Sequence, residues 1–222
     1  MFSLKTPPFN GWPLLGWITA ALLAMAAAAA LSGPEPVDAA RLVVRFTART
    51  SLVLFVLAFT ASGLARLAPS SATRWQLRNR RYLGLGFAVS HLIHAAALVA
   101  LGTLDRGLFL ELTTPVSYFT GGLVYLFIVL MTATSFNRTA AMIGPKAWAW
   151  LHTAGAWYIW MSFALNFGKR FAMNGAYWPA MVVIGAALAV RLVAVWRRPK
   201  RGPGPSGPPR LAALLAPTLS RP

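Results

Sequence analysis

Residues 80–102 read RRYLGLGFAVSHLIHAAALVALG, two arginines followed by a long apolar run that contains two histidines. About twenty apolar residues are enough for a helix to cross the ~30 Å hydrocarbon layer of a membrane. Backbone N–H and C=O groups find no water in lipid and must bond within their own segment, which favours a helix. The stretch therefore predicts a membrane-spanning helix that carries imidazole side chains at depth.

The composition of the whole chain agrees with this interpretation. Of its 222 residues, 57% are hydrophobic and 11% are charged, and the mean hydropathy is +0.59. A soluble domain carries about 25% charged residues, so a water-soluble globule or a disordered chain is excluded. The strict alternation of an outer-membrane β-barrel is absent.

We expect an all-α integral membrane protein, a bundle of six transmembrane helices in one domain, residues 14–196. A short N-terminal segment, 1–13, precedes it, and a basic tail rich in Pro and Gly, 197–222, follows and is expected to be disordered. The first apolar run could instead be a cleaved signal peptide, although it is longer than a usual one. The six expected spans are 14–32, 47–67, 82–102, 115–134, 147–166 and 177–196.

The charges predict the orientation of these spans. There are 21 Lys and Arg residues against four acids, a formal net charge of +17. Most basic residues fall on the side that holds both termini and the loops 68–81 and 135–146, whereas all four acids fall on the other side. Cytoplasmic loops carry an excess of Lys and Arg, so both termini are expected in the cytoplasm. The partner of this charge is expected to be membrane lipid and not nucleic acid.

Three histidines are the candidate chemical groups inside the membrane. His91 and His94 lie three residues apart in the third span, and His152 lies in the fifth. Intramembrane histidines mark an ion path, a proton relay or a cofactor, and imidazole is a common axial ligand of haem iron. Depth counted along the spans does not choose between His91 and His94 as the partner of His152. Alternatively, the three imidazoles only hydrogen-bond between helices as packing residues.

Other chemistries are less compatible with the sequence. The chain has no cysteine, which excludes iron–sulfur clusters and covalent c-type haem. No acid lies within an expected span, which disfavours a proton-coupled transporter. A zinc site would lack its third and fourth strong ligands.

Several residues could surround a cofactor. Arg49, Arg81 and Arg191 are candidates to contact a haem propionate or a quinone oxygen, although Arg49 and Arg191 can also extend to the lipid headgroups. Gly84, Trp157 and Trp160 are candidates to line the cofactor pocket, the two tryptophans with ordinary packing as the alternative.

Three motifs resemble a known family. They are FTART at 46–50, RRYLGL at 80–85 with His94 nine positions after Leu85, and KAWAWLH at 146–152. Together they resemble the ferric-reductase-like transmembrane haem proteins, in particular the MsrQ-like haem-binding subunits of bacterial periplasmic methionine-sulfoxide reductase systems. The resemblance covers roughly residues 40 to 195.

The resemblance implies a haem b electron-transfer subunit of the bacterial inner membrane that is not a catalyst by itself. It implies axial ligation by His94 and His152, with His91 in reserve. Quinol or a reduced flavin would be the donor, FMN is a further possible cofactor, and the acceptor would be a periplasmic molybdopterin methionine-sulfoxide reductase. The chain departs from the family where a further histidine is expected, because it has Leu165 and Asn166 there.

Two other functions stay open at this point. One is a ferric or other metal reductase, a membrane cytochrome b with another acceptor. The other is a non-redox six-span membrane protein, either a transporter or an assembly scaffold, in which the histidines serve packing alone.

Overall fold

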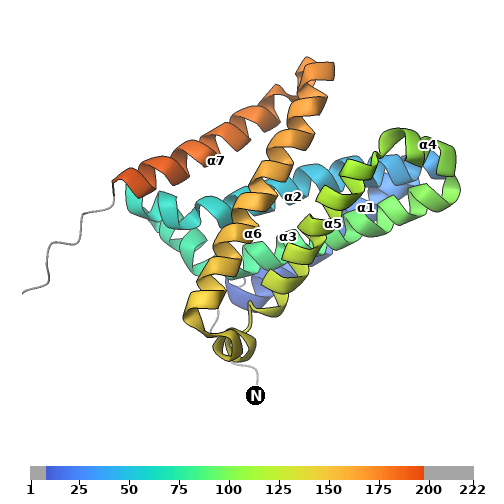
Figure 1. The fold of residues 1–222 in the computed structure, drawn as a ribbon. Helices are drawn as coiled ribbons and strands as arrows, with labels where there is room; N and C mark the ends of the chain where they lie inside the picture. The colour runs from blue at the N-terminus through green and yellow to red at the C-terminus, as the bar shows by residue number, and fades with distance from the viewer. Residues whose placement is uncertain (1–8, 198–222) are drawn as a thin grey trace, which may run out of the picture.

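The computed structural model describes residues 9–197, and it is helical throughout apart from short connections. No strand occurs in this part of the chain. The elements are α1 (Gly11–Ser32), α2 (Pro36–Leu67), α3 (Ser71–Leu104), α4 (Arg106–Leu112), α5 (Pro115–Ala133), α6 (Asn137–Met173), η1 (Gly175–Tyr177) and α7 (Trp178–Trp196) (Figure 1).

The expected all-α membrane class is confirmed at this level. Five helices are long and apolar enough to cross a membrane, namely α1, α2, α3, α5 and the segment η1–α7. The expected fifth span, 147–166, lies within α6, which is not among these five. The expected tail, 197–222, lies outside the described residues except for Arg197, as does most of the expected N-terminal segment, 1–13.

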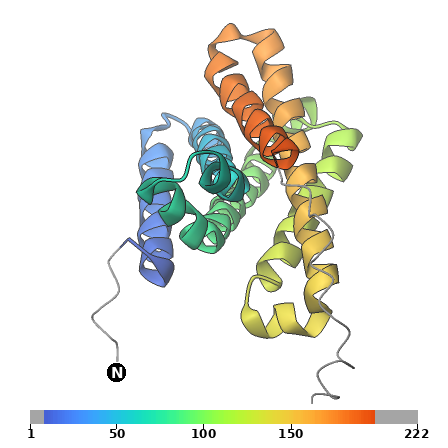
Figure 2. The same cartoon turned by 90° about the vertical axis from the view of Figure 1, so that its left-hand side faces the viewer.

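The helices form two groups, which α7 and a contact between α3 and α5 connect (Figure 2). In the first group α1, α2 and α3 pack against one another, with α2 and α3 in contact along most of their length. In the second group α5 packs on α6. α7 touches α2 and α6, and the backbones of α3 and α6 stay largely apart. The two helices that carry the histidines are therefore separated by side chains and open space.

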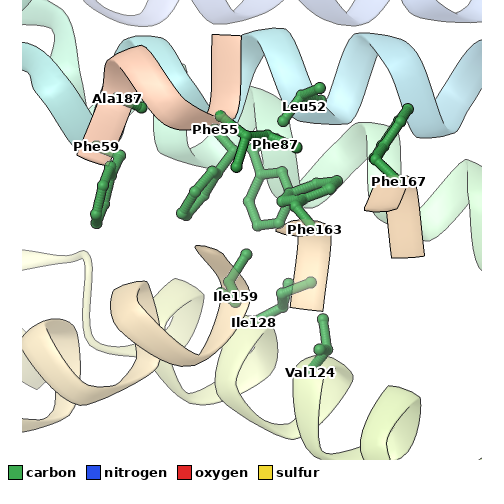
Figure 3. Close-up of a cluster of buried hydrophobic side chains, with 11 residues drawn as sticks. Leu52, Phe55, Phe59, Phe87, Val124, Ile128, Ile159, Phe163, Phe167 and Ala187 are labelled. Atoms are coloured by element: carbon green, nitrogen blue, oxygen red, sulfur yellow. The ribbon is translucent and has the colours of Figure 1, made fainter. Parts of the chain in front are cut away.

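A cluster of buried apolar side chains connects the two groups in the middle of the bundle (Figure 3). Phe55 of α2, Phe87 of α3 and Phe163 of α6 meet at its centre, with ring centroids 5.4 to 6.2 Å apart. Aromatic rings prefer such tilted contacts, and each ring removes a large apolar area from the surface. Ile159 of α6 is almost fully buried beside them.

Local sequence explains where the helices begin and bend. Ser70 caps α3, because its Oγ accepts a hydrogen bond from the N–H of Thr73 at 3.1 Å. α6 is interrupted at Gly144, whose φ of +78° favours glycine, and Pro145 starts the long segment that follows. The kink decides which face of this segment His152 presents to the rest of the bundle.

Candidate functional site

A cavity of about 760 Å³ lies between the two helix groups at the end where α3 begins. Of the three histidines only His152 lines it. Most of its wall is apolar and comes from four helices: Phe55 and Phe59 of α2, Leu85 and Phe87 of α3, Ile128 and Met131 of α5, and Ala156 and Ile159 of α6. We call this space the inner cavity.

His152 is held at the junction of α5 and α6. Its Nε2 lies 3.0 Å from Oγ1 of Thr134, the residue that follows α5. The indole of Trp148, one helical turn before His152, stacks on the imidazole with ring centroids 4.3 Å apart and donates from Nε1 to the Thr134 carbonyl at 3.0 Å. Thr134 therefore hydrogen-bonds to both Trp148 and His152 of the KAWAWLH motif.

Guanidinium groups gather on the inner cavity without an acidic neighbour on its wall. Arg78, Arg80 and Arg81 of α3 line it together with Arg191 of α7. Arg81 donates to Oδ1 of Asn137 at 2.8 Å, and the guanidinium carbon of Arg191 lies 4.7 Å from the centroid of the Phe59 ring. A cation over an aromatic face is attracted by the ring's negative centre. The cavity thus joins an apolar wall to a strongly positive rim.

The two histidines of α3 are bound to hydroxyl groups of α2. His94 Nδ1 lies 2.9 Å from Oγ1 of Thr47, which is fully buried, and His91 Nδ1 lies 3.0 Å from Oγ of Ser51. The hydroxyl of Tyr125 of α5 lies 3.4 Å from the carbonyl oxygen of His91. We call His91 and His94 the outer histidine pair.

The hydrogen bonds of the hydroxyl groups determine the direction of these contacts. Thr47 donates its proton to the Val43 carbonyl at 2.6 Å, and Ser51 donates to Ser90 Oγ at 2.8 Å. Each hydroxyl has one proton to give, so it accepts from the imidazole. Nδ1 of His91 and of His94 therefore donates to α2, and His94 also hydrogen-bonds to the Val44 backbone. Thr134 donates to the Leu130 carbonyl at 2.7 Å, so His152 carries its proton on Nε2 and leaves Nδ1 bare.

The outer histidine pair and His152 lie at different levels of the bundle. The His91 ring is 6.1 Å from the ring of Phe163, which follows His152 by three helical turns, about 16 Å along the axis. Phe87 lines the inner cavity, and its ring centroid is 4.9 Å from that of His91. Phe87 therefore lies between the inner cavity and His91 of the outer histidine pair.

The structure does not bring together the two residues expected to share one iron. An imidazole nitrogen lies about 2 Å from a bound metal, so two axial ligands have to approach within about 4 Å. His152 lines the inner cavity, whereas neither His94 nor the reserve ligand His91 does. The shared ligation of one haem by His94 and His152 stays a prediction.

The other candidate residues divide between the cavity and the packing. Gly84, Arg81 and Arg191 line the inner cavity. Trp160 donates to the Ile184 carbonyl at 3.2 Å, and Trp157 meets Phe59 edge to face, so both tryptophans pack α6 against its neighbours and neither lines the cavity. Arg49 does not line the cavity either. Its guanidinium carbon is 6.0 Å from the centroid of the Tyr177 ring.

The structure also shows the surroundings of Leu165 and Asn166, where the resemblance implies a further histidine. Leu165 is exposed, and Asn166 donates to the Ser162 carbonyl of its own helix at 2.8 Å. Phe163, and not either of these residues, faces the outer histidine pair.

Sequence reasoning missed the residues that orient the imidazoles. Thr47, Ser51 and Thr134 are hydroxyl-bearing residues of apolar segments, and such residues commonly bond to their own helix. Thr47 lies within the FTART motif, which was the one available signal. In the sequence, Arg78 and Arg80 fall in the loop 68–81, because the expected span begins at residue 82. In the structure α3 begins at Ser71, so both arginines lie on this helix and line the cavity.

No protein family model, curated protein or solved structure matches this chain.

Proposed function

We propose that this protein is a haem b subunit of the bacterial inner membrane, with six spans and cytoplasmic termini. In this proposal it passes electrons from quinol or reduced flavin to a periplasmic methionine-sulfoxide reductase that contains molybdopterin. The observation that carries the haem is the inner cavity, which combines His152, an apolar wall and several guanidinium groups. The donor, the acceptor and FMN enter through the resemblance of the three motifs.

The residues of the inner cavity fit a haem group. Its volume of about 760 Å³ lies within the 300–1,000 Å³ usual for small-molecule and cofactor sites. His152 has a bare ring nitrogen, Nδ1, that forms no hydrogen bond within residues 9–197, and either imidazole nitrogen can ligate a metal. Arg78, Arg80 and Arg81 supply guanidinium groups, which suit carboxylates such as the two propionates. Gly84 leaves space, because a Cβ there would meet no atom within 4 Å.

Each residue would contribute in its own way. When bound, haem supplies one-electron transfer through its iron. His152 would hold the iron, and Thr134 and Trp148 contact its imidazole and would orient it, as outer-shell partners of metal ligands commonly do. The phenylalanines and isoleucines of the wall would give the group an apolar surrounding, which influences the reduction potential.

The test is an optical spectrum of the protein purified in detergent with haem supplied. We expect Soret and α bands in the reduced-minus-oxidised spectrum of the wild type, and their loss in His152→Ala. Gly84→Leu, which fills the cavity, should also lose haem. Gly185→Leu is the matched control, since Gly185 of α7 also has no atom within 4 Å of an added Cβ and does not line the cavity. A colourless wild-type protein would reject the proposal.

A further inference from the structure

A second cavity, of about 560 Å³, lies between α3, α4 and α5, toward the end of α3 that is remote from the inner cavity. None of its wall residues lines the inner cavity. We call it the outer cavity. We propose that it binds a neutral quinone or hydroquinone, an inference that rests on the proposed function only for the ligand's role as electron donor.

The wall of the outer cavity suits a flat apolar ring. An added Cβ at Gly121 or Gly122 of α5 would meet no atom within 4 Å, so this helix leaves open space on the cavity. Phe109 of α4 and Tyr118 of α5 meet edge to face on the wall, with ring centroids 5.9 Å apart. Aromatic side chains offer further rings both faces and edges to pack on. The rest of the α3 wall is small or aliphatic: Ala95, Leu98, Val99 and Gly102.

Two tyrosines of α5 add hydroxyl groups to this wall. Tyr118 forms no hydrogen bond within residues 9–197. The hydroxyl of Tyr125 lies 3.4 Å from the His91 carbonyl oxygen, longer than the 2.5–3.0 Å usual for a hydroxyl donor. Residues seven positions apart share a helix face, about 10.5 Å apart along the axis. The two hydroxyls are therefore available to a ligand with an oxygen atom at each end, as a quinone ring has.

The charges around the outer cavity favour a neutral ligand over an anionic one. Of the described residues on its wall, only Arg106 is charged, and in the chain it lies between the acids Asp105 and Glu111. Asp105 is held at the start of α4, where it accepts from the Leu108 N–H at 2.9 Å. The inner cavity, in contrast, has four arginines and no acid on its wall. A phosphate group would thus find its complement at the inner cavity and not here.

Rings in contact connect the outer cavity with the inner cavity. Tyr125 lines the outer cavity, and its ring centroid is 5.4 Å from that of His91. On its other side His91 is 4.9 Å from Phe87, which lines the inner cavity. A redox-active ligand in the outer cavity is thus one line of packed rings away from the proposed haem site. This placement favours a quinone over a lipid without redox activity.

The outer cavity is open to the surface of the bundle. Val99, Leu110 and Tyr118 on its wall are exposed. α3 and α5 are long and apolar enough to cross a membrane, so this surface is expected to face lipid. The hydrocarbon tail of a quinone can extend from the cavity into the bilayer without burial in the protein.

The test is photolabelling of the full-length protein in detergent with an azido derivative of a short-tailed benzoquinone. The same quinone without the azide serves as competitor and gives the dissociation constant. We expect the label on residues 95–125 and a dissociation constant at least tenfold higher in Gly122→Leu, which fills the cavity. Gly185→Leu is the matched control, because Gly185 also has no atom within 4 Å of an added Cβ and lines neither cavity.

The tyrosine hydroxyls are tested without changing the shape of the cavity. Tyr118→Phe and Tyr125→Phe should each weaken quinone binding by about 2–10-fold, the loss of one hydrogen bond. Tyr158→Phe, on α6 and on the wall of neither cavity, should leave it unchanged. These variants decide the matter even if Gly122→Leu fails to fold.

The outcomes separate this inference from the proposed function. Label outside residues 95–125, or equal binding in Gly122→Leu and Gly185→Leu, overturns the inference. Phosphatidylglycerol that displaces the label at a lower concentration than the quinone also overturns it, because the occupant is then an anionic lipid. A protein that binds haem but no quinone overturns the inference alone. A protein that binds quinone in this cavity but gives no Soret band supports the inference and rejects the proposed function.

Discussion

The indole of Trp148 lies against the imidazole of His152, with planes 23° from parallel, and both side chains bond to Thr134. One residue at the end of α5 therefore accepts from two side chains of α6. We call these contacts of Trp148 and His152 with Thr134 the joint between α5 and α6. They hold the start of the long α6 segment, directly after the Gly144 kink.

Replacing Trp148 with Leu should loosen this joint. The variant loses the bond from Nε1 to the Thr134 carbonyl, worth roughly 1 kcal/mol, together with the ring stacking. We expect a melting temperature lower by about 4–8 °C in detergent, at about 2–4 °C per kcal/mol. Trp150→Leu is the control, because Trp150 is 71% exposed and lies two residues away. Equal effects in both variants would contradict the role of the joint.

Replacing Thr134 with Val should leave the fold but disturb the orientation of His152. The valine has nearly the shape of threonine and lacks the oxygen that accepts from Nε2. Loss of such an outer-shell partner typically weakens metal binding by about 10–100-fold, and we expect a haem affinity lower by that factor. Titration of the apoprotein with haem measures it. Thr134→Ser, which keeps the hydroxyl, should restore most of the affinity.

Neutralising two arginines at the rim of the inner cavity should weaken the binding of an anionic cofactor. Arg78→Gln combined with Arg80→Gln removes two charges that line the cavity. Both side chains are exposed, and exposed ion pairs contribute up to about 1 kcal/mol each, so haem affinity should fall by about 3–30-fold. Arg74→Gln, on the same helix but off the cavity, is the control. A haem titration at two salt concentrations should show a smaller salt effect in the double variant.

Replacing Thr47 with Val should destabilise the bundle without removing a large contact. Thr47 is fully buried, and its loss removes the hydroxyl that lies 2.9 Å from His94 Nδ1, leaving the Val44 backbone as the other partner of this imidazole. Loss of one buried hydrogen bond costs about 0.5–1.5 kcal/mol. The measurement is the unfolding midpoint in a denaturing detergent titration. Thr120→Val, on an exposed face of α5 where the hydroxyl bonds only to its own helix, should change it little.

Adding a methyl group at Gly33 should strain the connection between α1 and α2. An added Cβ would meet the backbone of α2, with the Ala39 Cα at 2.5 Å, and backbone atoms cannot rotate away. We expect Gly33→Ala to lower the free energy of unfolding by about 1–3 kcal/mol. Gly16→Ala in α1, where a Cβ meets nothing within 4 Å, should be neutral or stabilising by up to about 1 kcal/mol. Comparable losses at both glycines would show that the contact with Ala39 is not the cause.

The sequence by itself determined the helices and the three imidazoles that they carry into the bundle. Both follow from local properties, since apolar length decides whether a segment can span lipid and a histidine's place in that segment decides its depth. Each expected span lies within a helix of the structure to within one residue at its ends, and α2, α3 and α6 extend beyond the expected bounds.

Only the tertiary structure decided which of the three imidazoles lines the inner cavity. Depth counted from residues 82 and 147 leaves His94 and His152 about 10 Å apart. The contacts place Phe87 between the cavity that His152 lines and His91, the neighbour of His94. Their relation depends on the early start of α3, the Gly144 kink and the packing of Phe55 between the two helix groups. These contacts join residues far apart in the chain, and side-chain packing between separate helices leaves no periodic signal in either one.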